Sequence, residues 1–463
     1  MHRVPLKRST PVIAFASLAF VLAFGNAATA QSPAPTPTLS PTPIPIPIPI
    51  PTQRLTVNGA GESLPTGTDG DPNGLLGYVA SVARDVRFHF CASGSDAAIA
   101  AFAHRTPLGG ACADAPPDFI AIDAPLRASD AARFGRAIVV VPFVASSVAL
   151  VYDNPDVTGR LELSVGTLCK IASGEIANWD RIPRDPANPA GPAYPHRALH
   201  FVVRADGTGE TFALANFLSA RDENGRRTCE GTGQTFGLSA AYADGVLPRP
   251  LPHGASRTNF LSARSEAAEL ACVIGAPGAC AGNRSGGAGS IGYAGAAAAT
   301  AIARYPLGLA RLYVIRRGIP RDEDPIADLP GVATRLRAYA IGVGLANSAP
   351  NGRPQPELVP FESGTVDPQC AAVIPPRAYA FPPVGYPIVA VTELLFASDG
   401  NGERTIALRV LASIANRSDN FTTKRIRTID PDGVSTGTTG YSVLPLSTSR
   451  KTGLPALLRC IGT

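Results

Sequence analysis

The residue types best suited to chemistry gather in one stretch, RADGTGETFALANFL, at positions 204–218. The preceding HFVVR is apolar and rich in strand-forming residues, so Arg204 is predicted to end a strand. The following residues place apolar side chains on one face of a predicted helix. Between them, glycines let the backbone approach a ligand closely, and the first amides of a helix are unpaired donors, which indicates an anion site. A plain helix cap by Thr208 or Asp206 accounts for the same pattern, and on this stretch alone both interpretations stay open.

Three other stretches place small hydroxyl or amide donors where a predicted strand meets a predicted helix. They are GAGESLP (59–65), ASGSDAAIAAF (92–102) and FIAIDAPL (119–126). Taken singly, each is a common turn. The four stretches lie within a chain in which short apolar runs alternate with helical patterns from Leu55 onward, an order typical of α/β proteins with mostly parallel sheets.

Hydrophobic periodicity defines the elements that must position these loops. Strands are predicted over LTVNG, VRFHFC, DFIAID, AIVVVPF and GYPIVAVTELLF, and helices over 75–82, 97–102, 164–173 and 404–416. From about 306 to 383 the periodic pattern weakens into segments rich in proline and glycine, which are predicted to be loops.

Several motifs of enzymes and metal proteins occur, but their contexts exclude them. GAGSIG at 287–292 lacks a clear preceding strand, and GVSTG at 433–437 lies in a cluster of turn residues. A calcium-loop beginning at Asp69 has Ala80 where a bidentate glutamate is required. No Lys follows a Gly, and the six histidines are scattered along the chain. Neither a catalytic residue, a metal nor a cofactor is expected.

The N-terminal residues have the pattern of an export signal. A basic region, an apolar run and the small residues Ala28-Thr29-Ala30 predict a signal peptide over 1–30 that is too short to span a membrane. Alternating prolines over 31–53 predict an extended spacer, although a tail without a role is equally compatible with them. Removing three basic residues lowers the formal charge from +5 to about +2, so bulk charge does not favour nucleic-acid binding.

Eight cysteines in an exported chain favour disulfides over metal ligands, and no C-x-x-C pair is present. Many connectivities are possible. Proximity along the chain favours four pairs: Cys91 with Cys112, Cys169 with Cys229, Cys272 with Cys280, and Cys370 with Cys460.

The order and kind of the four loops resemble the phosphate-binding proteins of periplasmic ABC transporters, most closely their DING branch. There the matching stretches have the form G-A-G-A-T-F/L-P, G-S-G, S-D-A-P-L and R-A-D-G-S-G-T-T. Similar segments are SSVALVY, ELSVGTLCKIASGEIANWD, GSIGYA, GYPIVAVTELLF and a later LPL, so the likeness extends from Leu55 to the C-terminus. The resemblance also implies the Cys169–Cys229 bridge and places Cys370 and Cys460 near a second family bridge.

Carried over residue by residue, the resemblance implies a phosphate site. Arg204 would supply a charge-assisted fork and hydroxyls and helix N-termini would supply neutral donors, whereas Asp123 can only accept and so requires a proton on the ligand. Phosphate keeps such a proton near neutral pH, and sulfate does not. The implied residues are Ser63, Leu64 through its backbone, Ser95, Asp123, Arg204, Thr208, Gly209 and Glu210, with Thr211 as a further hydroxyl.

Two positions depart from the family pattern. Glu210 stands where the family has Thr, and we expect its side chain to point outward so that only its amide faces the anion. Ile122 replaces the Ser of S-D-A-P-L, and the hydroxyl of Thr211 is a candidate substitute.

The resemblance implies a periplasmic-binding-protein type II fold with a ligand cleft between two lobes, 54–144 plus 385–463 and 145–384. The expected function is capture of inorganic phosphate by a periplasmic or extracellular monomer, with an ABC permease as a possible partner and no membrane span in the mature chain. Two alternatives stay open: an exported phosphatase-type enzyme, and a surface or adhesion protein that keeps the fold without phosphate binding.

Overall fold

The computed structural model describes residues 54–462, except 63–74, 84, 111, 113, 127–129, 131–132, 222–224, 302–306, 338–365, 418–440 and 447–452. The predicted signal peptide and proline-rich spacer therefore lie outside the described residues, as do Ser63 and Leu64. The described residues belong to one compact unit.

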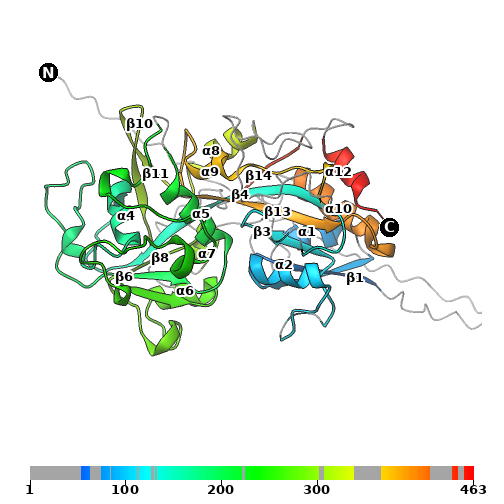
Figure 1. The fold of residues 1–463 in the computed structure, drawn as a ribbon, viewed down its shortest axis with the longest axis horizontal. Coiled ribbons are helices and arrows are strands. Elements are labelled where there is room, and N and C mark those ends of the chain that lie inside the picture. Colours follow the sequence, from blue (N-terminus) through cyan, green and yellow to red (C-terminus); the bar gives the residue numbers. More distant parts are fainter. Residues whose placement is uncertain are drawn as a thin grey trace, which may run out of the picture. The chain divides into compact units, whose positions relative to one another are not determined.

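Strands and helices alternate along most of the described chain (Figure 1). The strands are β1 Leu55–Gly61, β2 Val86–Ala92, β3 Phe119–Ile122, β4 Ile138–Asp153, β5 Glu162–Ser164, β6 His200–Arg204, β7 Phe260–Ala263, β8 Ser290–Gly295, β9 Gly308–Leu309, β10 Arg311–Arg316, β11 Ile319–Glu323, β12 Val366–Ala371, β13 Val389–Ala397 and β14 Tyr441–Val443. The α-helices are α1 Leu75–Val82, α2 Ser95–His104, α4 Val165–Ala172, α5 Gly209–Ser219, α6 Glu266–Val273, α7 Ala296–Ala301, α8 Leu329–Arg337, α9 Pro376–Ala380, α10 Thr405–Arg417 and α12 Leu454–Cys460.

Two groups of parallel strands lie at the ends of one large sheet, whose order is β2-β1-β3-β13-β4-β8-β6-β7. β1 pairs in parallel with β2 and β3, and β6 pairs in parallel with β7 and β8. The α/β class and the parallel pairing within each group are confirmed. Antiparallel strands β13 and β4 join the two groups, a feature that the expectation of mostly parallel sheets did not include.

The long strand β4 connects the two ends of the sheet (Figure 1). All of its residues except Asp153 are buried, as expected for a Val-rich strand covered on both faces. Its first part pairs with β13, and its later residues Val148 to Asp153 pair with β8. The segments AIVVVPF and SSVALVY are therefore parts of one strand.

Separate apolar clusters pack along this sheet. One is built around Trp179, Phe201 and Phe217 on the side of β6 and β8, and another around Phe119, Phe143 and Phe396 on the side of β3 and β13. The division into lobes 54–144 plus 385–463 and 145–384 stays a prediction.

The predicted elements are confirmed in position, with boundaries shifted by a few residues. In α4, the Ser164 side chain accepts a hydrogen bond from the Thr167 amide, and Gly174 follows the helix at φ 77°, so both predicted helix signals are used. The prediction of loops over 306–383 is wrong in part, because an antiparallel β10–β11 hairpin and the helices α8 and α9 form there.

All four favoured disulfides are confirmed. The pair Cys169–Cys229 fixes α4 to the segment that follows α5, and both cysteines are buried. This bridge therefore anchors the elements on either side of the predicted anion loop.

Candidate functional site

The carboxyl ends of β1 and β3 bring two acidic side chains together. Gly61 pairs with Ala121, and Glu62 and Asp123 are the first and second residues beyond that pair. The strands lie so close that a Cβ on Gly61, whose φ is +126°, would be 1.9 Å from the Ala121 carbonyl oxygen. The Glu62 amide also donates to that oxygen at 2.9 Å, so the backbone that carries Glu62 is fixed.

The N-terminus of α2 points at the Glu62 carboxylate. The backbone amide of Ser95, the first residue of the helix, donates to Glu62 Oε1 at 3.0 Å, and the Ser95 hydroxyl donates to the same oxygen at 2.9 Å. The Ser95 Oγ in turn accepts from the Asp123 amide at 3.2 Å. Both Ser95 and Glu62 are buried, so these bonds form away from solvent.

The N-terminus of α5 points to the same place. The amide of Gly209, its first residue, donates to Glu62 Oε1 at 3.4 Å. Thr208 caps the helix by accepting from the Thr211 amide at 3.2 Å. A helix cap and an anion site in RADGTGETF are therefore compatible. Thr208 caps the helix through the Thr211 amide, and the Gly209 amide is left to donate to a carboxylate.

Arg204 ends β6, as predicted, and its guanidinium lies next to this point. Two of its nitrogens donate to the two carboxylate oxygens of Asp206 at 2.9 and 2.7 Å. Its Nη1 lies 3.8 Å from Glu210 Oε2 and has no hydrogen-bond partner among the described residues. The Arg204 side chain is only 4% exposed, so a ligand oxygen would be an effective partner for that nitrogen.

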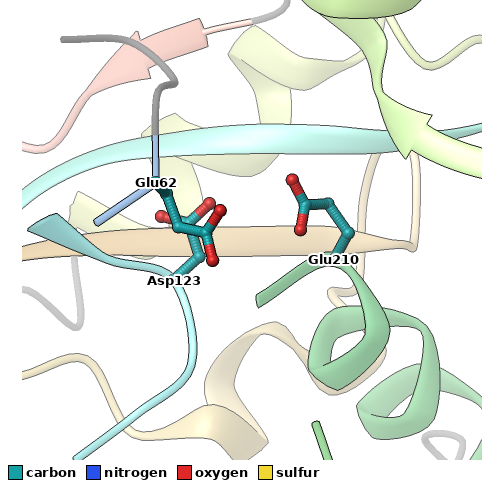
Figure 2. A group of neighbouring side chains, drawn as sticks. All are labelled: Glu62, Asp123 and Glu210. Carbon is teal, nitrogen blue, oxygen red and sulfur yellow. The ribbon is translucent and has the colours of Figure 1, made fainter. Parts of the chain in front are cut away.

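Three carboxyl groups surround the junction. Figure 2 shows Glu62 and Asp123 side by side, with the Glu210 side chain extending toward them from the start of α5. One oxygen from each of the three groups lies within 4.8 Å of the other two, and all three residues are buried. Asp123 Oδ1 and Glu210 Oε2 have no hydrogen-bond partner among the described residues.

This crowding of buried acids changes their protonation. Burial, and after it the charge of Glu210, raises the pKa of Glu62 to about 8, although Arg204 and the donors on Ser95 and Gly209 oppose the shift. Burial, followed by the charges of Glu62 and Glu210, raises the pKa of Asp123 well above its ordinary value. Both groups therefore bind protons more tightly than exposed acids do.

The expectation that Glu210 points outward is wrong. The residue is 3% exposed, and its carboxylate lies inside the cluster, close to the Arg204 guanidinium. The physical reason is that nearly every side of α5 is buried, so its first turn offers no route to solvent, and the buried guanidinium attracts the carboxylate.

The predicted site residues within the described chain come together at this junction: Ser95, Asp123, Arg204, Thr208, Gly209, Glu210 and Thr211. The Thr211 hydroxyl, a candidate substitute for the missing Ser at position 122, is hydrogen-bonded to Thr208 and to the Tyr293 hydroxyl at 2.8 Å. Tyr293 also accepts from the Arg204 amide at 3.1 Å, so it braces both anion-loop residues.

Sequence reasoning missed Glu62. The signal was present, because the family form G-A-G-A-T-F/L-P has Ala where GAGESLP has Glu62. Glu62 and Glu210 are thus two acidic replacements in two separate loops that resemble anion loops. The structure places oxygen atoms of these two side chains within 4.8 Å of each other.

Three carboxylates are also the ligand type that divalent cations prefer. The donors of Ser95 and Gly209 nevertheless point at Glu62 Oε1, and donor groups repel a cation at that atom. The junction therefore combines an anion-binding point, formed by two helix N-termini and Ser95, with acceptor groups beside it.

Two helix N-termini and a strand-end arginine converge at the carboxyl ends of parallel strands, where α/β sheets commonly bind their ligands. The PBP superfamily domain matches residues 59–316, and the chain belongs to that superfamily.

Individual relatives are distant. The phosphate-binding protein PstS of Pasteurella multocida is 34% identical over 106 residues, which are 22% of this chain and 29% of that protein. Alkaline phosphatase L of Pseudomonas aeruginosa is 28% identical over 24% of this chain and 26% of its own length. The chain thus matches less than a third of the length of these curated relatives.

Solved structures share the fold over most of the chain. A periplasmic phosphate-binding protein, PfluDING, solved with bound phosphate, superposes with a TM-score of 0.56 at 19% identity and covers 84% of this chain and 91% of its own. A phosphate-binding protein from Stenotrophomonas maltophilia gives a TM-score of 0.52 at 19% identity, with 86% and 92% covered. The fold predicted from the resemblance is confirmed.

Within the described part of the chain, no helix combines the length and the apolar character that crossing a bilayer requires.

Proposed function

We propose that the protein captures inorganic phosphate as an exported solute-binding protein for uptake or scavenging. One observation carries this proposal: the first amides of α2 and α5, together with the Ser95 hydroxyl, converge on a single oxygen atom, that of Glu62. Convergent neutral donors at two helix N-termini form an oxyanion-binding point, and the Arg204 guanidinium supplies positive charge beside it.

Asp123 supplies selectivity in this proposal. An ionised carboxylate only accepts hydrogen bonds, and Asp123 Oδ1 is buried without a hydrogen-bond partner among the described residues. A protonated phosphate oxygen satisfies this atom, whereas a sulfate oxygen leaves two acceptors facing each other. Relatives named as phosphate-binding proteins are consistent with this choice of ligand.

The wider role is also part of the proposal. Four disulfides favour an oxidising compartment, the periplasm or the outside of the cell, in agreement with the signal peptide predicted over residues 1–30. The proposal includes a monomer that delivers phosphate to an ABC permease and catalyses no reaction.

Calorimetry of the full mature chain tests this function. Titration with phosphate is expected to release binding heat that sulfate does not, and Arg204→Gln is expected to abolish it. Arg249→Gln, which changes an arginine whose side chain is 61% exposed, is the matched control and should bind normally. Absence of phosphate binding by the well-folded wild-type chain contradicts the proposal.

A phosphatase-type activity is the second candidate, because the Ser95 hydroxyl donates to the Glu62 carboxylate, which is a possible nucleophile–base pair. A relative named alkaline phosphatase L gives a further reason to test it. Turnover of a phosphate monoester that disappears in Ser95→Ala would favour the enzyme over the binding protein.

A further inference from the structure

The Glu62 carboxylate stands where an oxygen of an external anion would stand. Its Oε1 atom receives the Ser95 amide, the Ser95 hydroxyl and the Gly209 amide. An amide N–H is a single donor, so these groups cannot serve Glu62 and a ligand oxygen fully at the same time. Occupation by Glu62 and occupation by a ligand therefore exclude each other.

The charges around the junction oppose a second anion. Carboxylate oxygens of Glu62, Asp123 and Glu210 lie within 4.8 Å of one another, while two nitrogens of the nearby Arg204 guanidinium are already bonded to Asp206. A doubly charged ligand placed among these groups meets repulsion that increases as water is excluded. With the Glu62 side chain still in place, the donors are taken, and the ionised fraction of Glu62, whose pKa is about 8, adds a further negative charge.

Hydrogen bonds hold the backbone that carries Glu62. Its amide is bonded to the Ala121 carbonyl, and the carbonyl of the preceding Gly61 accepts from the amides of Ser93 and Gly94. These bonds hold the backbone on both sides of the junction. With the backbone held in this way, the carboxylate can leave the donors only by rotation of its side chain.

We propose that Glu62 is the specificity-determining residue of the oxyanion site: its carboxylate is an internal ligand that an external oxyanion must displace. Glu62 thereby lowers the affinity of the site and selects for ligands that compensate for the lost bonds. This inference rests on the proposed function only in its choice of phosphate as a probe. The internal occupancy itself can be tested without phosphate.

The first experiment uses chemical rescue. Glu62→Ala removes the atoms that correspond to acetate and leaves the donors of Ser95 and Gly209 in place. Acetate is therefore expected to raise the melting temperature of Glu62→Ala by several degrees and to leave that of the wild type unchanged. Glu403→Gln, which alters an exposed glutamate, is the control and should behave as the wild type. A Glu62→Ala protein that acetate does not stabilise overturns the inference.

The second experiment measures phosphate affinity by calorimetry in the presence of EDTA. Glu62→Ala is expected to bind phosphate at least tenfold more tightly than the wild type and Glu403→Gln. If the wild type binds phosphate, equal or weaker binding by Glu62→Ala overturns the inference. Wild-type binding that requires added Mg²⁺ or Ca²⁺ and is lost on substitution of Glu62 also overturns it, because the carboxylate would then be a metal ligand.

The two arms separate the failure of this inference from the failure of the proposed function. If acetate stabilises Glu62→Ala but neither protein binds phosphate, Glu62 is an internal ligand of a site for a different oxyanion. If Glu62→Ala does not fold, Glu62→Gln replaces it, since the amide keeps an acceptor oxygen but removes the charge. Glu62→Gln should bind phosphate about tenfold more tightly, and an unchanged or lower affinity overturns the inference.

Discussion

Gly209 packs against Asp123 so closely that no side chain fits between them. A Cβ built on Gly209 would lie 1.9 Å from the Cβ of Asp123 and 2.8 Å from its Cα. The contact joins the first residue of α5 to the loop after β3, and it brings the Gly209 amide to Glu62 Oε1. The junction therefore requires a glycine at this position because there is no space for a side chain, and not because the backbone must be flexible.

Gly209→Ala should therefore separate the two loops. The added methyl group forces the start of α5 away from Asp123, and a decrease in unfolding free energy of about 1–3 kcal/mol is expected, as for overpacked cores. Urea denaturation measures the loss, and calorimetry should show weakened phosphate binding. Gly231→Ala is the control, because nothing lies within 4 Å of a Cβ built there. Equal free energies of unfolding for the two variants would show that the loops around Gly209 accommodate the methyl group without loss of stability.

Glu210 is predicted to weaken phosphate binding. Its carboxylate is buried in the cluster and lies 3.8 Å from Arg204 Nη1, where it competes with a ligand for the guanidinium. Glu210→Gln removes one negative charge while preserving the size of the side chain. Phosphate affinity should rise by tenfold or more, about 1.4 kcal/mol, in a calorimetric titration.

Glu210→Thr, which restores the family residue, should increase phosphate affinity at least as much. If the Glu210 side chain pointed outward, this substitution would add only the small contribution of one hydroxyl hydrogen bond. If both substitutions weaken phosphate binding instead, the Glu210 carboxylate must take part in holding the ligand. Glu230→Gln, in the exposed segment after Cys229, serves as the control for the loss of a negative charge.

Local patterns were enough to predict the elements that build the site. Arg204 ends a strand and Thr208 caps a helix because period-two and period-3.6 patterns and capping residues act over a few neighbouring positions. Strand β11 was missed because most of its side chains are exposed and lie in a segment rich in charges, so no apolar alternation marks this half of the β10–β11 hairpin.

Local patterns could not predict where the Glu62 and Glu210 side chains point. Glu210 lies in the first turn of a helix, where an acidic residue is ordinarily favourable and exposed. Its burial follows from the packing of α5 against α9 and β13 and from the position of Arg204, which are tertiary relationships. Likewise, the Glu62 carboxylate is bound by residues 33 and 147 positions away in the sequence.

Glu393 should make the stability of the protein depend on pH. It lies in the middle of β13, is 3% exposed, and its Oε2 has no hydrogen-bond partner within the described chain. Burial raises its pKa from 4.5 to about 8, although a backbone hydrogen bond from Ile374 opposes the shift. The folded state thus retains a proton that the unfolded state has lost, and the free energy of unfolding falls as pH rises from 4.5 to about 8.

Glu393→Gln should remove this contribution, because glutamine is neutral at every pH. Urea denaturation near pH 5 should give similar stabilities for the variant and the wild type. Near pH 9 the variant should be more stable by up to a few kcal/mol. A stability difference that does not change between these conditions would show that Glu393 is ionised in the folded protein.

The disulfides Cys169–Cys229 and Cys272–Cys280 should differ in their contribution to stability. Both pairs are buried, but the first joins residues 60 apart in sequence and the second joins residues 8 apart. Since the restriction of the unfolded chain grows with the logarithm of loop length, losing the first bridge should destabilise the protein by about 2 kcal/mol more than losing the second. Denaturation of the two double Cys→Ala variants measures this difference, and equal losses would contradict the loop-length account.

Asp123 is predicted to discriminate between phosphate and sulfate. Its buried Oδ1 lacks a hydrogen-bond partner among the described residues, and an ionised carboxylate there accepts only from a ligand that carries a proton. Asparagine can also donate, so Asp123→Asn should gain affinity for sulfate. Its loss of discrimination between the two anions should exceed its loss of phosphate affinity, and paired titrations measure both. Asp244→Asn, which alters an exposed aspartate, is the control.

The pH dependence of this discrimination gives a sharper test. Burial, and then the charges of Glu62 and Glu210, raises the pKa of Asp123, so part of the protein carries a neutral Asp123 that can donate to sulfate. Raising the pH ionises the group, and the preference of the wild type for phosphate over sulfate should increase. The preference of Asp123→Asn should stay flat over the same range, because its amide does not titrate. If the two proteins show the same pH profile, selectivity resides in another group of the junction, and Glu62, whose pKa is about 8, is the first to test.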